Sequence, residues 1–136
     1  MGIFSLIKPL TKYEDYVYRA GTYESWFLKK KAIQVMRLAT EQNFSKEEIS
    51  SGLIYLGLLY SSSKEYREAS DCFNKALELV KNQNFNYSGN FKKIIQTFIK
   101  NGEHQKAEYW LAHLLQRQNY DENFKKMAAL SKKFTQ

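Results

Sequence analysis

The sequence predicts an all-α fold, a short α-solenoid of antiparallel helix pairs with six to seven helices. Three observations support this prediction. Apolar residues recur at helical spacing, and no long stretch alternates apolar with polar residues as a half-buried strand would. The chain has one proline among 136 residues, so few positions would interrupt a helix. Short turn signals separate the periodic segments into pairs, which is typical of helical repeat proteins.

The composition describes a chain that can form one globular domain. With 43% hydrophobic and 26% charged residues it can bury a core, which argues against extended disorder. No apolar run approaches the ~18 residues that a membrane-spanning helix needs. The single cysteine, Cys72, cannot form an internal disulfide, and residues 1–10 lack the cationic start of a secretory signal. We therefore expect a cytoplasmic protein, and the abundance of Lys and Asn suggests a bacterial source.

Local chemistry marks the helix boundaries in the larger part of the chain. Ser45 followed by Glu48 forms a capping box, so a helix should begin directly after Ser45. Asn101-Gly102 is a turn signal, and the Asn-rich stretch 82–90 predicts a loop or a frayed helix end. The predicted helices here span 46–61, 64–82, 89–100, 103–118 and 121–134.

Two further helices are expected over residues 13–42, with a break between Gly21 and Ser25. Residues 1–12 are predicted to be an N-terminal tail, and residues 13–136 a single domain. Several aromatic residues fall near the predicted break: Tyr13, Tyr16, Tyr18, Tyr23, Trp26 and Phe27. Because large aromatic side chains carry much apolar area, most of them are expected to pack in the core or between helices. Tyr and Trp are also common interface anchors, so an N-terminal aromatic face that binds the partner stays open as an alternative.

One segment carries a specific repeat pattern, in which seven residues follow at intervals of 3, 1, 3, 9, 4 and 3. These residues are Leu53, Leu56, Gly57, Tyr60, Ala69, Phe73 and Ala76. The pattern resembles the tetratricopeptide repeat, a helix-turn-helix unit of ~34 residues, which would run here from 50 to 83. Gly57 and Ala69 are small, as expected where two antiparallel helices cross closely. The fold that the resemblance implies is a solenoid of such helix pairs.

Looser copies of the same pattern flank this unit. The residues Phe91, Ile94, Ile95, Phe98, Ala107, Leu111 and Leu114 repeat its intervals and define a unit over 88–121. A degenerate copy fits 13–46, although a register in which Gly21 and Tyr23 open the second helix is also open. The segment 121–134, with Phe124, Met127 and Ala128 on its apolar side, resembles the first helix of an unfinished copy that caps the array.

The sequence offers no catalytic or metal-binding constellation, so we expect neither an enzyme nor a cofactor. His104 and His113 are nine residues apart on one predicted helix, which places them on opposite sides because nine residues turn a helix by about 900°. No Cys or His partner stands at metal-ligand spacing. Cys72 lies beside Phe73 and is expected to be a packed thiol rather than a nucleophile.

The resemblance implies a partner that lies in the concave groove lined by the first helix of each pair. The groove positions of the family, carried over to this sequence, are Ile54, Leu58, Lys92, Gln96, Ile99, Lys100, Lys125 and Lys126. Two alternatives stay open: Ile54 and Leu58 can pack against the upstream helices, and the lysines can form a solvated helix face.

The net charge of +7 is concentrated at one end of the chain. Residues 1–80 hold 11 Lys and Arg against 10 Asp and Glu, whereas residues 81–136 hold 10 against 4. We therefore expect a non-catalytic protein–protein interaction module, of the adaptor, chaperone or toxin-neutralising type, that binds an acidic protein or peptide. The alternative is a nucleic-acid- or ribosome-associated protein that uses the cationic end, although 17 of the 21 bases are Lys rather than Arg. A homodimer formed by stacking of terminal helices is a further alternative.

Overall fold

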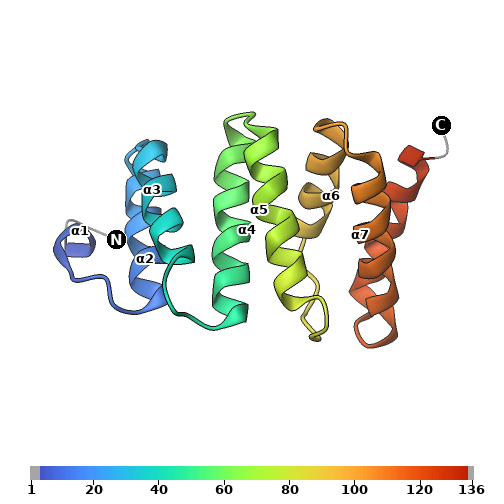
Figure 1. Cartoon of the computed structure of the whole chain (residues 1–136), viewed down its shortest axis with the longest axis horizontal. Helices are drawn as coiled ribbons and strands as arrows, with labels where there is room; N and C mark the ends of the chain where they lie inside the picture. The colour runs from blue at the N-terminus through green and yellow to red at the C-terminus, as the bar shows by residue number, and fades with distance from the viewer. Residues whose placement is uncertain (1–3, 135–136) are drawn as a thin grey trace. The chain divides into compact units, whose positions relative to one another are not determined.

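A computed structural model describes residues 4–134 of the chain, with side chains from Leu6 onward. The described residues form helices, turns and loops and contain no strand, which confirms the all-α prediction (Figure 1). The chain divides into two compact units, unit 1 up to Lys81 and unit 2 from Asn82 onward.

Unit 1 consists of a short N-terminal helix followed by two antiparallel helix pairs. Its helices are α1 (Phe4–Ile7), α2 (Tyr13–Ser25), α3 (Lys29–Thr40), α4 (Lys46–Ser62) and α5 (Tyr66–Val80). Helix α4 begins with the predicted capping box, in which the Ser45 hydroxyl accepts a hydrogen bond from the Glu48 amide at 3.1 Å. Of the predicted N-terminal tail, residues 1–3 lie outside the described residues, and Leu10 packs against the core of unit 1.

The same type of turn joins the two helices in all three pairs. In each turn one residue takes a positive φ: Phe27 at 61°, Lys64 at 61° and Gly102 at 77°. The amide of that residue donates to the carbonyl three residues back, and the next amide donates to the carbonyl five residues back, at 2.8–3.0 Å. This is the Schellman arrangement that ends many helices.

The first of these turns shows that the predicted break was misplaced. Helix α2 continues through Gly21 to Ser25, and the chain leaves the helix only over residues 26–28. Gly21 therefore lies inside a helix, and the alternative register that starts the second helix there is wrong. The positive φ falls on Phe27, although glycine adopts this conformation far more readily, so the sequence held no turn residue to mark it.

The turns lie 37 and 38 residues apart along the chain. This spacing supports the repeat units at 13–46, 50–83 and 88–121, which we keep as a proposal, together with a capping segment at 121–134.

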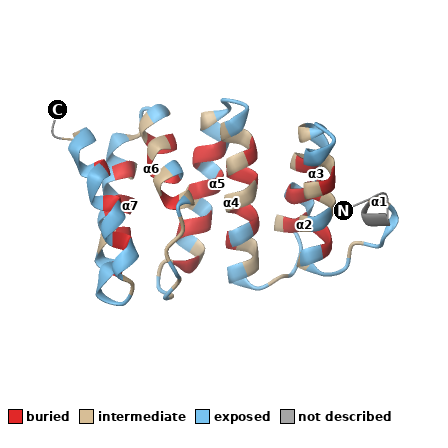
Figure 2. Ribbon diagram, turned by 180° about the vertical axis from the view of Figure 1, so that it is seen from behind, coloured by how far each residue is buried: buried red, intermediate tan, exposed pale blue. Residues whose placement is uncertain are grey.

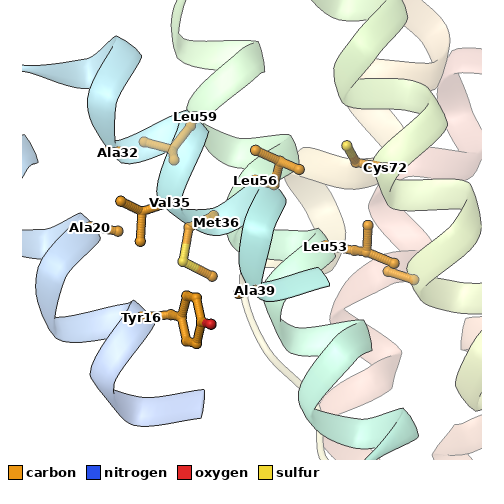
Figure 3. Close-up of a cluster of buried hydrophobic side chains, with 11 residues drawn as sticks. Tyr16, Ala20, Ala32, Val35, Met36, Ala39, Leu53, Leu56, Leu59 and Cys72 are labelled. Atoms are coloured by element: carbon orange, nitrogen blue, oxygen red, sulfur yellow. The ribbon is translucent and has the colours of Figure 1, made fainter. Parts of the chain in front are cut away.

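The core of unit 1 is built where small residues let the helices approach. Its buried cluster is drawn in Figure 3 and consists of Tyr16, Ala20, Ala32, Val35, Met36, Ala39, Leu53, Leu56, Leu59, Cys72 and Ala76. Ala20, Ala32 and Ala69 have no exposed surface. Gly57 lies under the ring of Phe73, so the small residues do mark the close crossing of α4 and α5. Figure 2 shows these buried positions in red along the helices.

The start of α2 is held by the carboxylate of Asp15. It accepts hydrogen bonds from the amide of Lys12 at 2.8 Å and from the amide and hydroxyl of Thr11 at 3.1 and 3.0 Å. The ammonium of Lys8 lies 3.4 Å away. These donors stabilise the charged form of the carboxyl, and the backbone amide of Lys12 contributes most. They therefore hold the pKa of Asp15 well below its ordinary range.

Acid is expected to destabilise unit 1 through Asp15. The folded chain resists protonation of this carboxyl, so the unfolded chain takes up the proton first as the pH falls. The contribution of Asp15 is therefore present above its ordinary pKa of about 4 and is lost as the pH falls below that value. Thermal unfolding followed by circular dichroism should show a smaller drop in midpoint on acidification for Asp15→Asn than for the wild type. Glu14→Gln at the exposed neighbouring position is the control, and equal drops in wild type and Asp15→Asn would contradict this role.

Unit 2 contains one helix pair and a long 3₁₀ segment. Its elements are α6 (Asn90–Lys100), α7 (His104–Gln116), η1 (Arg117–Asn119) and η2 (Glu122–Phe134). All α-helical boundaries from α4 to α7 lie within two residues of those predicted.

The segment predicted as an amphipathic α-helix over 121–134 is a 3₁₀ helix instead. Its buried residues are Phe124, Met127 and Leu130, three residues apart. A 3₁₀ helix has three residues per turn, so this spacing places all three side chains on one face. Ala128, predicted on the apolar side, is exposed because it lies off that face.

The Asn-rich connection before α6 is an ordered loop rather than a frayed helix end. The guanidinium of Arg117 donates to the carbonyl of Gln83 at 2.6 Å and lies 3.8 Å from the ring centre of Phe85. The hydroxyl of Tyr120 donates to the carbonyl of Phe85 at 2.8 Å. The amide of Tyr87 donates to Asp121 at 3.0 Å, and this contact lowers the pKa of that carboxyl. The loop is thus fastened to the end of α7 and the start of η2.

Candidate partner-binding surface

Helix α6 separates a buried face from a face that reaches solvent. The buried face holds Phe91, Ile94, Ile95, Thr97 and Phe98. The other face holds four of the predicted site residues: Lys92, Gln96, Ile99 and Lys100. Lys100 is exposed and the other three are partly exposed. Because the two lysines and the glutamine are four residues apart, they form one stripe along the helix.

Of the two predicted lysines of η2, Lys126 lies near an aromatic platform. Lys125 and Lys126 are both exposed. The ammonium of Lys126 lies 5.6 Å from the ring centre of Tyr87, and the Tyr87 ring centre lies 6.1 Å from that of Phe91. Through Tyr87, Lys126 is thus connected to the first turn of α6, beside Lys92. We call Lys92, Gln96, Lys100, Lys125 and Lys126 the cationic surface of unit 2.

The two apolar site residues belong to α4 in unit 1. Ile54 is partly buried and packs against the buried cluster of that unit. Leu58 is also partly buried. These two residues lie in unit 1, whereas the lysines lie in unit 2.

The two histidines and the cysteine lie outside this surface. His113 is partly buried, and its ring lies tilted against those of Tyr109 and Trp110, with ring centres 4.6 and 5.6 Å away, whereas His104 is exposed. Cys72 is buried, and burial raises the pKa of its thiol to about 11, so it stays protonated. Over residues 4–134 no three His, Cys, Asp or Glu side chains gather where they could hold a metal ion.

The structure exposes an apolar turn that includes two of the aromatic residues of which we expected most to be buried. Trp26, Phe27 and Leu28 connect α2 to α3, with exposed fractions of 47%, 95% and 38%. Tyr18 is also exposed, whereas Tyr16 is buried and Tyr13 and Tyr23 are partly buried. A signal for the turn was present in the sequence, since Phe27 stands 37 residues before Lys64 and so falls at the turn position of the degenerate copy.

The family comparison matches the tetratricopeptide repeat model to residues 50–83. These residues contain the α4–α5 pair, with Gly57 packed against Phe73. The chain therefore carries a tetratricopeptide repeat. No curated protein and no solved structure matches the chain.

Tetratricopeptide repeats are in general units of protein–protein interaction and not of catalysis, so the match indicates a protein partner. None of the helices within the described residues combines the length and the apolar character that a crossing of the membrane requires.

Proposed function

We propose that this tetratricopeptide-repeat chain is an adaptor, chaperone or toxin-neutralising module that binds an acidic protein or peptide segment through the cationic surface of unit 2. The observation that carries the proposal is the stripe of Lys92, Gln96 and Lys100 on the solvent-facing side of α6. In the tetratricopeptide family, partners usually lie along the first helix of each pair, and α6 is the first helix of its pair. A cytoplasmic location and a bacterial source remain predictions from composition.

Charge favours an acidic occupant for this surface. From residue 82 onward the chain holds nine bases against four acids, so the potential around unit 2 attracts anions. Gln96 adds a hydrogen-bonding group between the two lysines, and Ile99 adds apolar area beside them. The ammonium of Lys126 lies over the Tyr87 ring, 5.6 Å from its centre, and this cation–π contact favours that position of the charge. Such a surface recognises carboxylates spaced along an extended or helical segment.

Reversing two of these charges is expected to abolish most of the binding. The probe is a fluorescein-labelled Glu/Leu-rich peptide, and the measurement is its fluorescence anisotropy at low and high salt. Lys92→Glu with Lys126→Glu should weaken binding by about tenfold or more, because attraction becomes repulsion at both positions. The wild-type affinity should fall as salt rises.

The matched control is Lys132→Glu with Lys133→Glu, which makes the same change of charge at the other end of η2 and should affect binding less. Equal losses in the two double variants would show that net charge alone drives binding and would contradict the assigned surface. An RNA oligonucleotide serves as a second probe. Tighter binding of RNA than of the peptide would favour the nucleic-acid alternative instead. Light scattering of the chain alone tests the homodimer.

A further inference from the structure

Unit 1 has a groove along its second helices, α3 and α5, and not along its first helices. Its widest part has a volume of about 960 Å³ and lies between Lys29, Lys30 and Arg37 of α3 and Glu65 and Glu68 of the α5 side. A second hollow of about 380 Å³ shares Arg37, Tyr60 and Glu68 with the first. A third hollow of about 410 Å³ shares Leu53 and Lys75 with the second and reaches Leu79.

The first two hollows form a groove between α3 and α5, and the third, whose lining holds no α3 residue, extends it along α5, so that the whole runs from Glu65 to Leu79. At 1.5 Å per residue this length is about 21 Å, which is enough for a partner helix of four turns. By contrast, the first helices of unit 1 lie against each other. The hydroxyl of Tyr55 on α4 donates to Glu24 on α2, and the ring of Tyr13 lies against Gly52.

The floor of the groove is apolar and comes from α4, which lies between α3 and α5 in Figure 1. Leu53, Leu56 and Tyr60 form this floor, and Cys72 joins it from α5. Leu53, Leu56 and Cys72 belong to the buried cluster of Figure 3 and keep 8%, 4% and 9% of their surface exposed, so the groove reaches down to the core. An occupant therefore needs an apolar face.

The two walls of the groove carry opposite charges. The α3 wall holds Lys29, Lys30 and Arg37, and the α5 wall holds Glu65, Glu68 and Asp71. In the part of the chain that the structure describes, no ion pair joins these two walls. In the second hollow the signs are exchanged beyond Arg37 and Asp71, with Glu41 on the α3 side and Lys75 on α5, and Glu78 of α5 lines the third hollow. Charges of opposite sign that face each other across a groove are complementary to an occupant with acidic groups on one flank and basic groups on the other.

The mouth of the groove carries an exposed and strained aromatic residue. Phe27 lines the widest part of the groove, is 95% exposed, and has a φ of 61°. A bulky residue in this conformation costs free energy that glycine would not. The equivalent turn residues of the other pairs are Lys64 and Gly102, so the turn itself does not require an aromatic residue. A large exposed aromatic side chain is typical of an interface anchor.

We propose that the groove between α3 and α5 binds an amphipathic helix of a protein partner, with an acidic flank along α3 and a basic flank along α5. Its apolar face packs on Leu53, Leu56 and Tyr60, and Phe27 covers one of its ends. This site is independent of the cationic surface of unit 2, and it lies on the second helices of the pairs rather than on the first.

The test uses two synthetic helical peptides of identical composition and the full-length chain. One peptide has a Leu/Ala face with Glu along one flank and Lys along the other. The control peptide has the same face with Glu and Lys mixed on both flanks. The segregated peptide should bind at least about tenfold more tightly than the mixed one. No binding of the segregated peptide, or equal binding of the two, would overturn the proposal.

Charge reversal of the walls then locates the site. Lys30→Glu with Arg37→Glu, and separately Glu68→Lys with Asp71→Lys, should each weaken binding by about tenfold or more. The variant that combines all four substitutions restores the net charge and reverses the sign of each wall, although Lys29 and Glu65 keep their charges. It should bind the segregated peptide again, because a helix that enters in the opposite direction presents its flanks the other way round. Failure of the combined variant, with its helical circular dichroism intact, would count against the groove.

Phe27→Gly separates binding from folding. Glycine accepts the positive φ without strain, so the thermal midpoint should rise. The peptide affinity should nevertheless fall severalfold, because the anchor is lost. A variant that gains stability and keeps full affinity would show that Phe27 does not touch the occupant.

Light scattering tests whether a second copy of the chain occupies the groove instead. If the wild type is a dimer, and Glu68→Lys with Asp71→Lys dissociates it, a second copy lies in the groove and the proposal is overturned.

Discussion

Replacing Gly57 by alanine is expected to destabilise the tetratricopeptide repeat by about 2 kcal/mol, at the middle of the range for an overpacked core. A Cβ added at Gly57 would lie 2.4, 2.6 and 2.9 Å from three ring carbons of Phe73. These distances are far inside van der Waals contact, and the Phe73 side chain is fully buried, so its ring cannot swing into solvent. Alanine is the better helix former by ~1 kcal/mol, so the steric cost must exceed that gain for the variant to be destabilised.

Gly52 of the same helix provides the matched control. A Cβ there would lie 3.3 Å from the Tyr13 ring and 3.5 Å from the Thr40 methyl group, both on partly buried residues that can shift. Gly52→Ala should therefore be neutral or stabilising by up to ~1 kcal/mol. Urea unfolding followed by circular dichroism compares the two variants. Combining Gly57→Ala with Phe73→Leu should recover part of the loss, because leucine lacks the ring carbons that clash. Equal stability of the two alanine variants would contradict the close crossing of α4 and α5.

The helix pairs could be predicted because their sequence signals are local and redundant. The interval between Gly57 and Phe73 fixes which turns of α4 and α5 meet. Small residues on both helices indicate the same crossing point. Boundaries such as Ser45 and Asn101-Gly102 have side chains or a glycine that suit the backbone there. Each of these signals involves residues within one repeat, so no knowledge of the tertiary arrangement is needed to use them.

The turn at Phe27 could not be predicted in this way because its conformation contradicts its side chain. An aromatic residue between Trp26 and Leu28 suggests a buried segment, and nothing local marks a positive φ. The tertiary fold imposes that φ, since α2 and α3 must reverse direction there. The 3₁₀ form of η2 was hidden for a related reason. Positions 124 and 127 fit both 3.6 and three residues per turn, and only Leu130 distinguishes the two.

The candidate sites also differ in whether local sequence signals or the tertiary fold determine them. The lysine stripe of α6 follows from one helix and its buried face, so helical periodicity is sufficient to predict that it reaches solvent. The packing of Ile54 against the core depends on what lies beside α4, which the sequence left open. The groove between α3 and α5 depends on how two helices diverge across a third. Its wall charges are visible in the sequence, but their opposition across an apolar floor is a property of the folded unit.

Replacing Phe124 by alanine is expected to destabilise unit 2 by about 3–5 kcal/mol, the range for truncation of a buried phenylalanine. The ring is fully buried and stacks on Phe91 of α6 at a centre-to-centre distance of 5.8 Å. It also contacts Phe85 and Tyr87 of the loop before α6, with ring centres 6.2 and 5.4 Å away. Its loss therefore removes the side chain that joins the loop, α6 and η2.

The consequence should be visible residue by residue and not only in the overall stability. Amide hydrogen exchange of Phe124→Ala should increase in η2, in the loop at 82–89 and at the start of α6, because these elements share the ring. Lys125→Ala, at the exposed next position of η2, is the control and should leave exchange in the loop unchanged. If Phe124→Ala costs less than ~1 kcal/mol, η2 packs only loosely on α6. Lys125 and Lys126 would then have no fixed position beside Lys92, because their place on the cationic surface depends on η2 being held by this ring.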